Sequence, residues 1–313
     1  MNENSFISFI VPSYNSENSI EKCLESIQNV DYLKNNFEII IVDNGSKDGT
    51  VDIAKRFTDK IFIDNTATIA KLRNDGAKKS KGDFLVFLDS DCLLPKDWLI
   101  NASEHFKDPA VVLVGSTTII LPGGDSWIDK AWKVHLDSIK ANKQVMWIVS
   151  RAMAVRRDVF FLVGGFDESL VTCEDVDFGY RVSRKYKVIS DKRLAPLHLK
   201  TINTLVEFFK KESWRGKDSL RVSLKYIKKW KEILSFASLM YYFILILLIA
   251  PSLALSLILR NMLFISLILI CITLPLIIIT FNTCLTKKQF SYFWKLLVLY
   301  GVYILARLRA IFQ

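Results

Sequence analysis

The feature that most constrains this chain is a pair of long stretches without charge in its last third. One runs from Phe236 to Leu259 and the other from Met262 to Leu285, and each has 24 residues. Only Arg260 and Asn261 lie between them. About 20 apolar residues in a helix are enough to cross the roughly 30 Å hydrocarbon core of a bilayer. The two stretches therefore predict a helical hairpin that spans a membrane.

A third stretch, 290–312, gives a weaker signal because its uncharged part, Leu296 to Ala306, has 11 residues. It can span if the charged residues at its ends snorkel, or it can lie in the interface. We expect it to span. No Asp or Glu follows Glu232, which argues against buried core helices of a soluble protein. We assign residues 236–313 to a transmembrane region with spans at about 236–259, 262–285 and 290–312.

Most of the net charge of +10 lies in and beside this apolar region. Residues 1–206 carry a net charge of −1, residues 207–232 one of +5, and residues 233–313 one of +6. A nucleic-acid-binding protein would spread Lys and Arg over a folded face, so we expect no nucleic acid partner. Lysines before the first span and after the second place both ends of the hairpin in the cytoplasm by the positive-inside rule.

The segment at the other end of the chain agrees with this orientation. The apolar run Phe6–Val11 is too short for a signal peptide and has no basic residues before it, so we do not expect the N-terminal domain to be exported. The sequence predicts an integral protein of the cytoplasmic membrane with its N-terminal domain in the cytoplasm.

The connecting residues 204–235 mix large apolar side chains with nine Lys or Arg residues. The apolar residues recur at roughly helical spacing, which predicts amphipathic helices. Such helices can lie flat on an anionic leaflet. They can equally pack on the preceding domain as ordinary helices, and one helix could do both.

Residues 1–203 have the pattern of an α/β domain. Short apolar runs alternate with helical patterns, with strands expected at 6–11, 37–42, 60–63 and 84–88 and helices at 19–28, 50–57 and 69–79. Such alternation predicts a mostly parallel, doubly wound sheet with right-handed crossovers. Ligands of such sheets bind at the carboxyl ends of the strands.

Polar residues follow three of the expected strands. Pro12-Ser13-Tyr14-Asn15 follows the first, Asp43-Asn44-Gly45-Ser46 the second, and Asp89-Ser90-Asp91 the run 84–88. Any one of these is typical of a turn, but three at one edge of a sheet indicate a binding site. Asp89 and Asp91 would lie about 7 Å apart in an extended chain. A divalent cation would neutralise their repulsion.

These segments resemble the opening of family 2 glycosyltransferases of the GT-A fold. The resemblance rests on Phe9–Asn15, on Ile40–Thr50 and on Phe87-Leu88-Asp89-Ser90-Asp91, which is similar to the DXD motif of that family. Further segments match its acceptor-side motifs in family order: Arg156–Phe160, Gly164–Glu168 and Glu174-Asp175. The match covers roughly residues 5–200. The chain looks like the membrane-anchored subgroup with C-terminal transmembrane helices.

The resemblance implies a role for each matching residue. Asp175 would be the general base, and Asp91 with His198 would hold Mg²⁺ or Mn²⁺ against the diphosphate of the donor. The nucleotide sugar would be bound by Pro12, Tyr14, Asn15, Glu17, Asp43, Arg73, Asn74 and Asp89. The acceptor side would comprise Arg156, Arg157, Asp167, Glu174, Trp214 and Arg215.

The chemistry of glycosyl transfer requires the same residue types. A bound cation stabilises the charge that develops on a leaving diphosphate. A carboxylate must take the proton of the acceptor hydroxyl, which typically contributes 10²–10⁴-fold. One base and one in-line displacement invert the anomeric centre. Glu174 and Asp175 would point about 100° apart in a helix, so we expect Asp175 to act as base while Glu174 orients. The acidic cluster could otherwise serve only the helix dipole.

The sequence departs from the family pattern at two places. Ser150-Arg151-Ala152-Met153 stands where relatives often have a small residue and Asn, so the acceptor pocket is expected to differ. Processive synthases of the family carry Gln-x-x-Arg-Trp after the base, whereas this chain has only Trp214-Arg215-Gly216. The reversed dipeptide argues against processive polymerisation.

We therefore expect an inverting, metal-dependent glycosyltransferase. Its donor would be a nucleotide sugar, and its acceptor a polyprenyl-linked or cell-envelope saccharide at the membrane. Two alternatives stay open: a non-catalytic membrane scaffold that retains the fold, and a nucleotidyltransferase. The latter would need a glycine-rich basic loop after the first strand, and Ser13-Tyr14-Asn15-Ser16 supplies none.

Overall fold

A computed structural model describes residues 5–121, 126–138, 143–227 and 230–312. The chain divides into two compact units. The first comprises residues 1–122 and 139–201, and the second comprises residues 123–138 and 202–313. The second unit thus takes one helix from the middle of the chain, between two strands of the first.

The first unit is built on an eight-stranded sheet in the order β3-β2-β1-β4-β8-β6-β9-β7. Four neighbouring strands, β3 to β4 in that order, run parallel, while β8 runs antiparallel to both β4 and β6. The strands are β1 Ile7–Ser13, β2 Phe37–Asp43, β3 Ile61–Ile63, β4 Phe84–Leu88, β6 Val111–Gly115, β7 Lys143–Val145, β8 Ala152–Arg156 and β9 Lys187–Ser190. A separate antiparallel pair joins β5 Cys92–Leu93 to β10 Leu197–His198.

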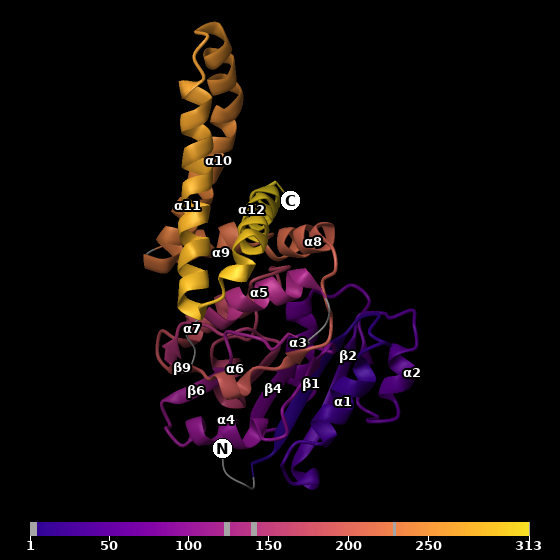
Figure 1. Cartoon of the computed structure of the whole chain (residues 1–313). Coiled ribbons are helices and arrows are strands. Elements are labelled where there is room, and N and C mark those ends of the chain that lie inside the picture. Colours follow the sequence, from indigo (N-terminus) through magenta and orange to yellow (C-terminus); the bar gives the residue numbers. More distant parts are fainter. Residues whose placement is uncertain (1–4, 122–125, 139–142, 228–229, 313) are drawn as a thin grey trace. The chain divides into compact units, whose positions relative to one another are not determined.

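Helices cover both faces of the sheet (Figure 1). They are α1 Ile20–Gln28, α2 Thr50–Ala54, α3 Ile69–Lys79, α4 Trp98–Phe106, α6 Arg157–Leu162 and α7 Glu174–Val182, with short 3₁₀ turns at Lys34–Asn36 and Lys192–Leu194. Strand β4 is apolar on both faces because helices cover each face of the sheet. Its Val86 and Leu88 pack toward α1 and α4, and its Leu85 and Phe87 pack toward α6 and α7. The expected mostly parallel α/β sheet is confirmed.

In the described residues, the regular secondary structure of the second unit is helical (Figure 1). The helices are α5 Trp127–Ser138, α8 Leu205–Arg215, α9 Ser219–Lys225, α10 Trp230–Ile258, α11 Leu263–Lys287 and α12 Phe293–Ala310, with a 3₁₀ turn at Phe290–Tyr292. Ile128, Ala131 and Val134 of α5 are buried in the same apolar cluster as Phe208 of α8 and Leu299 of α12. This cluster is why α5 belongs to the second unit.

Three helices of this unit are long and apolar enough to cross a membrane. They are Phe236–Ile258, Leu263–Lys287 and Phe290–Ala310, with mean hydropathies of 2.3, 2.9 and 1.2. Pro251 and Pro275 lie inside the first two. The chain is therefore equipped for membrane association, as its uncharged stretches predict.

Candidate active site

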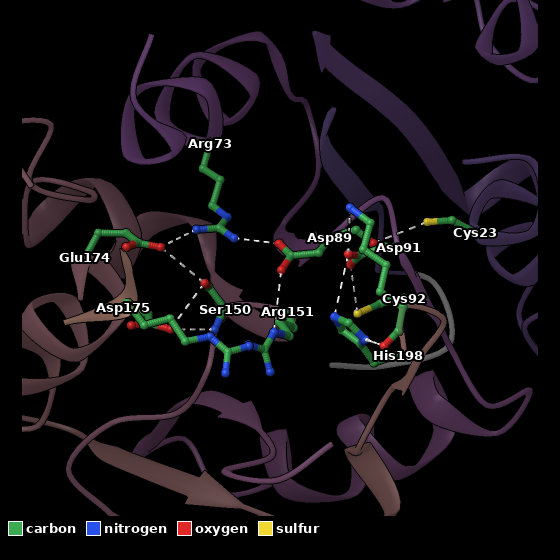
Figure 2. Close-up of polar contacts among 12 residues, drawn as sticks. Cys23, Arg73, Asp89, Asp91, Cys92, Ser150, Arg151, Glu174, Asp175 and His198 are labelled. Atoms are coloured by element: carbon green, nitrogen blue, oxygen red, sulfur yellow. Dashed lines mark hydrogen bonds and ion pairs between the residues drawn. The ribbon is translucent and has the colours of Figure 1, made fainter. Parts of the chain in front are cut away.

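The topology of the sheet brings distant segments to one edge. Strands β1, β2 and β4 are parallel and end at Ser13, Asp43 and Leu88, so their carboxyl ends share that edge. Strand β8 is antiparallel to β4 and begins at Ala152, which pairs with Leu88. The residues before β8 therefore lie beside the residues after β4. This pairing assembles the candidate site shown in Figure 2.

Arg73 of α3 lies at the centre of the site. Its Nη2 atom is 2.6 Å from Oδ1 of Asp89, and its Nη1 atom is 2.5 Å from Oε1 of Glu174. The side chain is 2% exposed, so its charge is balanced by these two carboxylates and not by water. Figure 2 shows the guanidinium joining the turn after β4 to the start of α7.

Ser150 holds the two acidic residues that begin α7. Its backbone N–H donates to Oδ2 of Asp175 at 3.0 Å, and its hydroxyl donates to the same oxygen at 3.3 Å. The hydroxyl also lies 3.4 Å from Oε1 of Glu174. Burial, together with the neighbouring charge of Asp175, raises the pKa of Glu174 to about 7. The two carboxyls therefore differ: Glu174 is buried and bound to Arg73, and Asp175 is more exposed.

A second acidic group faces a histidine beside the same turn. Oδ2 of Asp91 is 3.6 Å from Nε2 of His198 and 3.6 Å from Nζ of Lys200. The pairing of β5 with β10 sets His198 opposite Cys92, the neighbour of Asp91. Nδ1 of His198 lies 3.0 Å from the carbonyl oxygen of Lys200, which can only accept a hydrogen bond. Nδ1 therefore carries a hydrogen, and Nε2 is the ring nitrogen that faces Asp91.

These two side chains are of the kind that binds a divalent cation. A carboxylate oxygen and an imidazole nitrogen face each other at 3.6 Å. Their separation lies between the roughly 3 Å of adjacent ligands and the about 4 Å of opposite ligands of an octahedral ion with bonds of about 2.1 Å. The described residues contain no group of three or more His, Cys, Asp or Glu side chains placed to hold a metal ion. The other ligands would come from outside the chain, as is usual for Mg²⁺ at phosphates.

The segments after β1 and β2 are tied to each other. Asp43 is fully buried and accepts hydrogen bonds from the hydroxyls of Ser13 and Ser46, at 2.7 and 2.6 Å. Asn15 accepts from the backbone N–H of Lys47 at 2.9 Å, and Glu17 from that of Gly49 at 2.9 Å. These carboxylate and amide oxygens therefore shape the edge of the sheet.

Two other residues of this edge differ in exposure. Tyr14 is 55% exposed, and Pro12 lies within β1, where it pairs with Val42. The tyrosine ring is thus open to a ligand.

Asn74, next to Arg73 on α3, forms hydrogen bonds with the backbone of a turn that is distant in sequence. Its amide group donates to the carbonyl oxygen of Phe166 at 2.9 Å and accepts from the N–H of the same residue at 2.9 Å. A Cβ atom on Gly165, whose φ is +64°, would come within 2.7 Å of Oδ1 of Asn74. Asp167 bonds to Ser169 of the same turn. Asn74 and Asp167 thus fix the chain that leads into α7.

The two arginines predicted on the acceptor side lie elsewhere. Arg156 ends β8 opposite Phe84, the first residue of β4, and is therefore at the other edge of the sheet from Asp89. Its guanidinium donates to the carbonyl oxygens of Val111 and Phe106. Arg157 donates to Ser80. The structure does not bring this pair to the site, because β8 runs away from it.

The tryptophan–arginine pair belongs to the second unit. Trp214 and Arg215 end helix α8, and Nη1 of Arg215 is 2.5 Å from Oε1 of the buried Glu212. Arg215 therefore takes part in an ion pair within that unit.

Ser150, Arg151 and Lys200 are site residues to which we assigned no role from the sequence. In the sequence, Ser150 and Arg151 were noted only as a departure from the family pattern. Their place follows from the antiparallel pairing of β8 with β4, which joins segments more than 60 residues apart and leaves no local signal. Lys200 follows His198 by two residues, so its place near the site could be inferred only from the histidine.

Two thiols lie under the aspartates. Sγ of Cys23 is 3.6 Å from the carbonyl oxygen of Asp89, and Sγ of Cys92 is 3.7 Å from Oδ1 of Asp91. Burial, reinforced by the two carboxylates, raises the pKa of both thiols far above the ordinary value. They stay protonated and support the turn as donors.

A profile described as glycosyl transferase family 2 matches residues 8–161 of this chain. The glycosyltransferase AglE of Haloferax volcanii is 31% identical over 238 residues, which cover 69% of this chain and 74% of that protein. The poly(ribitol-phosphate) β-N-acetylglucosaminyltransferase TarS of Staphylococcus aureus is 34% identical over 204 residues, or 59% of this chain and 34% of TarS. The chain belongs to glycosyltransferase family 2.

Solved structures agree on the fold. The mannosyltransferase PcManGT of Pyrobaculum calidifontis, determined in complex with GDP-Man and Mn²⁺, superposes with a TM-score of 0.66 at 19% identity, covering 94% of this chain and 86% of that one. TarS superposes with a TM-score of 0.51 at 23% identity, over 69% of this chain and 40% of its own. The fold is thus GT-A-like, and the protein is a glycosyltransferase.

Proposed function

We propose that this enzyme transfers a sugar, with inversion, from a nucleoside diphosphate donor to an acceptor hydroxyl held at the membrane. The observation that carries the proposal is the single network in which Arg73 joins Asp89 to Glu174, while Ser150 holds Asp175 beside them. Donor-side and acceptor-side carboxylates are thereby fixed in one site.

The cation site supports a metal-dependent reaction. Asp91 and Nε2 of His198 would hold Mg²⁺ or Mn²⁺. When bound, such an ion neutralises the charge that develops on the departing diphosphate. Nζ of Lys200, 3.6 Å from Asp91, adds a second positive charge at the same place. The first aspartate of the pair, Asp89, is held by Arg73 and faces the remainder of the donor.

Asp175 is the residue best placed to act as general base. The proton of the acceptor hydroxyl passes to Asp175 as the acceptor oxygen bonds to the anomeric carbon. The bond from that carbon to the diphosphate oxygen breaks, and the nucleoside diphosphate leaves on the opposite side. Glu174 is a poorer candidate because Arg73 occupies its carboxylate and burial favours its protonated form. It positions Arg73 and the start of α7.

Two relatives support an acceptor at the cell envelope. TarS acts on poly(ribitol-phosphate), according to its name. A relative from Methanococcus voltae, 34% identical over 110 residues, is named for transfer to a dolichyl-phosphate-linked sugar. We propose an acceptor of the same class, either lipid-linked or an envelope saccharide.

The helices of the second unit support a membrane location. With lysines at both outer ends of the α10–α11 hairpin, we place the catalytic unit on the cytoplasmic side of the cytoplasmic membrane. Confining enzyme and acceptor to one surface raises their effective concentration.

Calorimetric titration of the detergent-solubilised protein with UDP and GDP tests the proposal. We expect one nucleotide to bind in the presence of Mn²⁺ and to bind much more weakly after chelation. Asp91→Asn should abolish the effect of Mn²⁺, whereas Asp158→Asn, an exposed residue at the other edge of the sheet, should not. If neither nucleotide binds with Mn²⁺ or Mg²⁺, the proposed function is refuted.

A further inference from the structure

Arg151 is a cation of the site with five N–H donors and no hydrogen bond from them in the described residues. It lies in the turn before β8, and its Nε atom is 3.9 Å from Oδ2 of Asp89. That distance allows an ion pair but is too long for a hydrogen bond. Among the described residues, no hydrogen bond reaches its guanidinium, although the side chain is 21% exposed. Arg73, in contrast, has two short contacts with carboxylates.

The backbone around Arg151 is fixed from both sides. Its carbonyl oxygen accepts a hydrogen bond from the N–H of Asp89 at 3.1 Å, and the residue before it holds Asp175. Figure 2 shows Arg151 between the Ser150–Asp175 contact and the turn that carries Asp89. Its side chain therefore starts between the proposed base and the donor-side aspartate, where the reacting ends of both substrates must meet.

A guanidinium carries five N–H donors in a planar fork that matches the oxygens of a carboxylate or phosphate. The side chain is 21% exposed, and none of its nitrogens is among the buried, unpartnered atoms of the described residues, so the fork is open to a ligand. Asp91 lies on the other side of Asp89, where Lys200 and the proposed cation already supply positive charge for the diphosphate. The fork of Arg151 is thus left for a different oxyanion.

We propose that Arg151 binds an oxyanion carried by the reacting end of a substrate. This inference rests on the proposed function, and it deepens it by requiring an acidic substrate. The oxyanion is either the carboxylate of a uronic acid donor or the phosphate next to the acceptor sugar of a lipid-linked substrate. Arg151 is then a specificity-determining residue.

The test compares Arg151→Gln and Arg151→Lys with an exposed control, Arg184→Gln. The donor arm measures binding of UDP, UDP-glucose and UDP-glucuronate in Mn²⁺. The acceptor arm measures the stimulation of UDP release by undecaprenyl phosphate and by undecaprenol. Thermal unfolding of each variant checks that it is folded.

We expect Arg151→Gln to weaken one acidic probe by roughly 10- to 100-fold, the usual effect of losing hydrogen bonds to a charged group. UDP and the matching neutral probe should change little, and Arg151→Lys should recover part of the loss. Weaker binding of UDP-glucuronate would show that the oxyanion belongs to the donor. Weaker stimulation by undecaprenyl phosphate would show that it belongs to the acceptor. An equal loss on UDP itself, or no change on any probe, would overturn the inference. Failure of the wild type to bind any nucleotide would instead refute the proposed function.

A different observation concerns α12 and its packing within the second unit. Nη2 of Arg307 is 3.0 Å from Oε2 of Glu212 on α8, and a Cβ atom on Gly216 would come within 2.7 Å of the Cβ atom of Ala310. Two turns earlier on the same face of α12, the hydroxyl of Tyr300 shares a hydrogen bond of 2.9 Å with Nδ1 of His135 on α5. Helices α5 and α8 carry charged residues on most turns, so α12 is packed against helices that are unsuited to hydrocarbon.

The end of α12 can be located along the hairpin. The ring of Phe312 lies 6.0 Å from that of Phe243 on α10. Helix α10 continues from there to Ile258, which is about 23 Å at 1.5 Å per residue. The C-terminal end of α12 therefore stops far short of the turn between α10 and α11.

We infer that α12 does not cross the membrane but lies with α5 and α8 at the surface of the leaflet from which α10 starts. An epitope placed after Gln313 should then be accessible from the same side as one at the N-terminus. An epitope inserted between Arg260 and Asn261 of the full chain should be accessible only from the other side. Accessibility of the C-terminal epitope together with the inserted one would refute the inference.

Discussion

At the scale of single residues, the neighbouring carboxyls of α7 differ in their surroundings. Asp175 keeps an orientation set by Ser150 and is partly exposed, while Glu174 is buried and bound to Arg73. The difference arises from burial and partners, because the two residues are adjacent on the same helix.

Asp175→Asn should leave nucleotide binding unchanged and lower transfer by about 10²–10⁴-fold, since an amide cannot take the acceptor proton. Titration calorimetry measures the first effect and release of nucleoside diphosphate the second. Asp177→Asn is not a suitable control, because Asp177 is itself buried and paired with Arg181. The exposed Asp158→Asn serves instead. Near-normal turnover of Asp175→Asn would exclude it as the base.

Glu174 should make the stability of the protein depend on pH. Burial raises its pKa from 4.5 to about 7, so the folded protein binds this proton more tightly than the unfolded chain does. Its stabilising contribution is complete below pH 4.5 and is lost as pH rises through about 7. Glu174→Gln removes this dependence. The unfolding temperature of wild type minus that of the variant should therefore fall with pH across this window and level off above it; a difference independent of pH would contradict the shift.

At the scale of elements, the position of α7 depends on a close approach of backbones. Gly179 lies in the middle of this helix, and a Cβ atom there would come within 2.4 Å of the Cβ atom of Trp147 and 2.5 Å of its Cα atom. Helix α7 can therefore lie against the segment that leads to Ser150 only if this residue is glycine.

Gly179→Ala should push α7 away from that segment and lengthen the contacts of Ser150 with Asp175. We expect a loss of about 1–3 kcal/mol in the free energy of unfolding, the usual effect of overpacking, together with a fall in turnover. Gly301→Ala on α12 is the matched control, since nothing lies within 4 Å of a Cβ atom there. Unfolding temperature and turnover, measured for both variants, decide the matter; equal effects would show that the contact is unimportant.

At the scale of the whole molecule, the two units are not consecutive in the sequence. Residues 123–138 and 202–313 form the second unit, so the chain enters it twice. Our sequence-based boundaries, 1–203, 204–235 and 236–313, treat the front domain as continuous and assign α5 to it. Apolar residues of α5 instead pack with α8 and α12.

Truncation after residue 203 should therefore yield a poorly soluble protein, because Ile128, Ala131 and Val134 would lose their cover. Replacing 123–138 by a short glycine-serine linker in the same truncated chain should restore solubility. Size-exclusion chromatography distinguishes monomer from aggregate. A monomeric truncated chain that still contains α5 would show that this helix does not need the second unit.

Much of this protein was predictable from its sequence because the signals are local. Apolar runs and their periods predicted strands β1 to β4, helices α1 and α3, and the hairpin of α10 and α11. The strand ends and the family resemblance indicated the aspartates after β4 and the acidic pair of α7, and the structure joins Asp89 to Glu174 through Arg73. Each of these predictions depends on residues close together in the sequence, whose hydrophobic periodicity indicates which side chains are buried.

Only the tertiary structure decided which residues of the later motifs meet at the site. The antiparallel pairing of β8 with β4 brings Ser150 and Arg151 to Asp89 and carries Arg156 to the opposite edge. The apolar face of α5 found its partners in α8 and α12, far along the chain. Sequence patterns tell which side of an element is buried. They do not tell which element covers it, because that choice depends on the packing of segments a hundred or more residues apart.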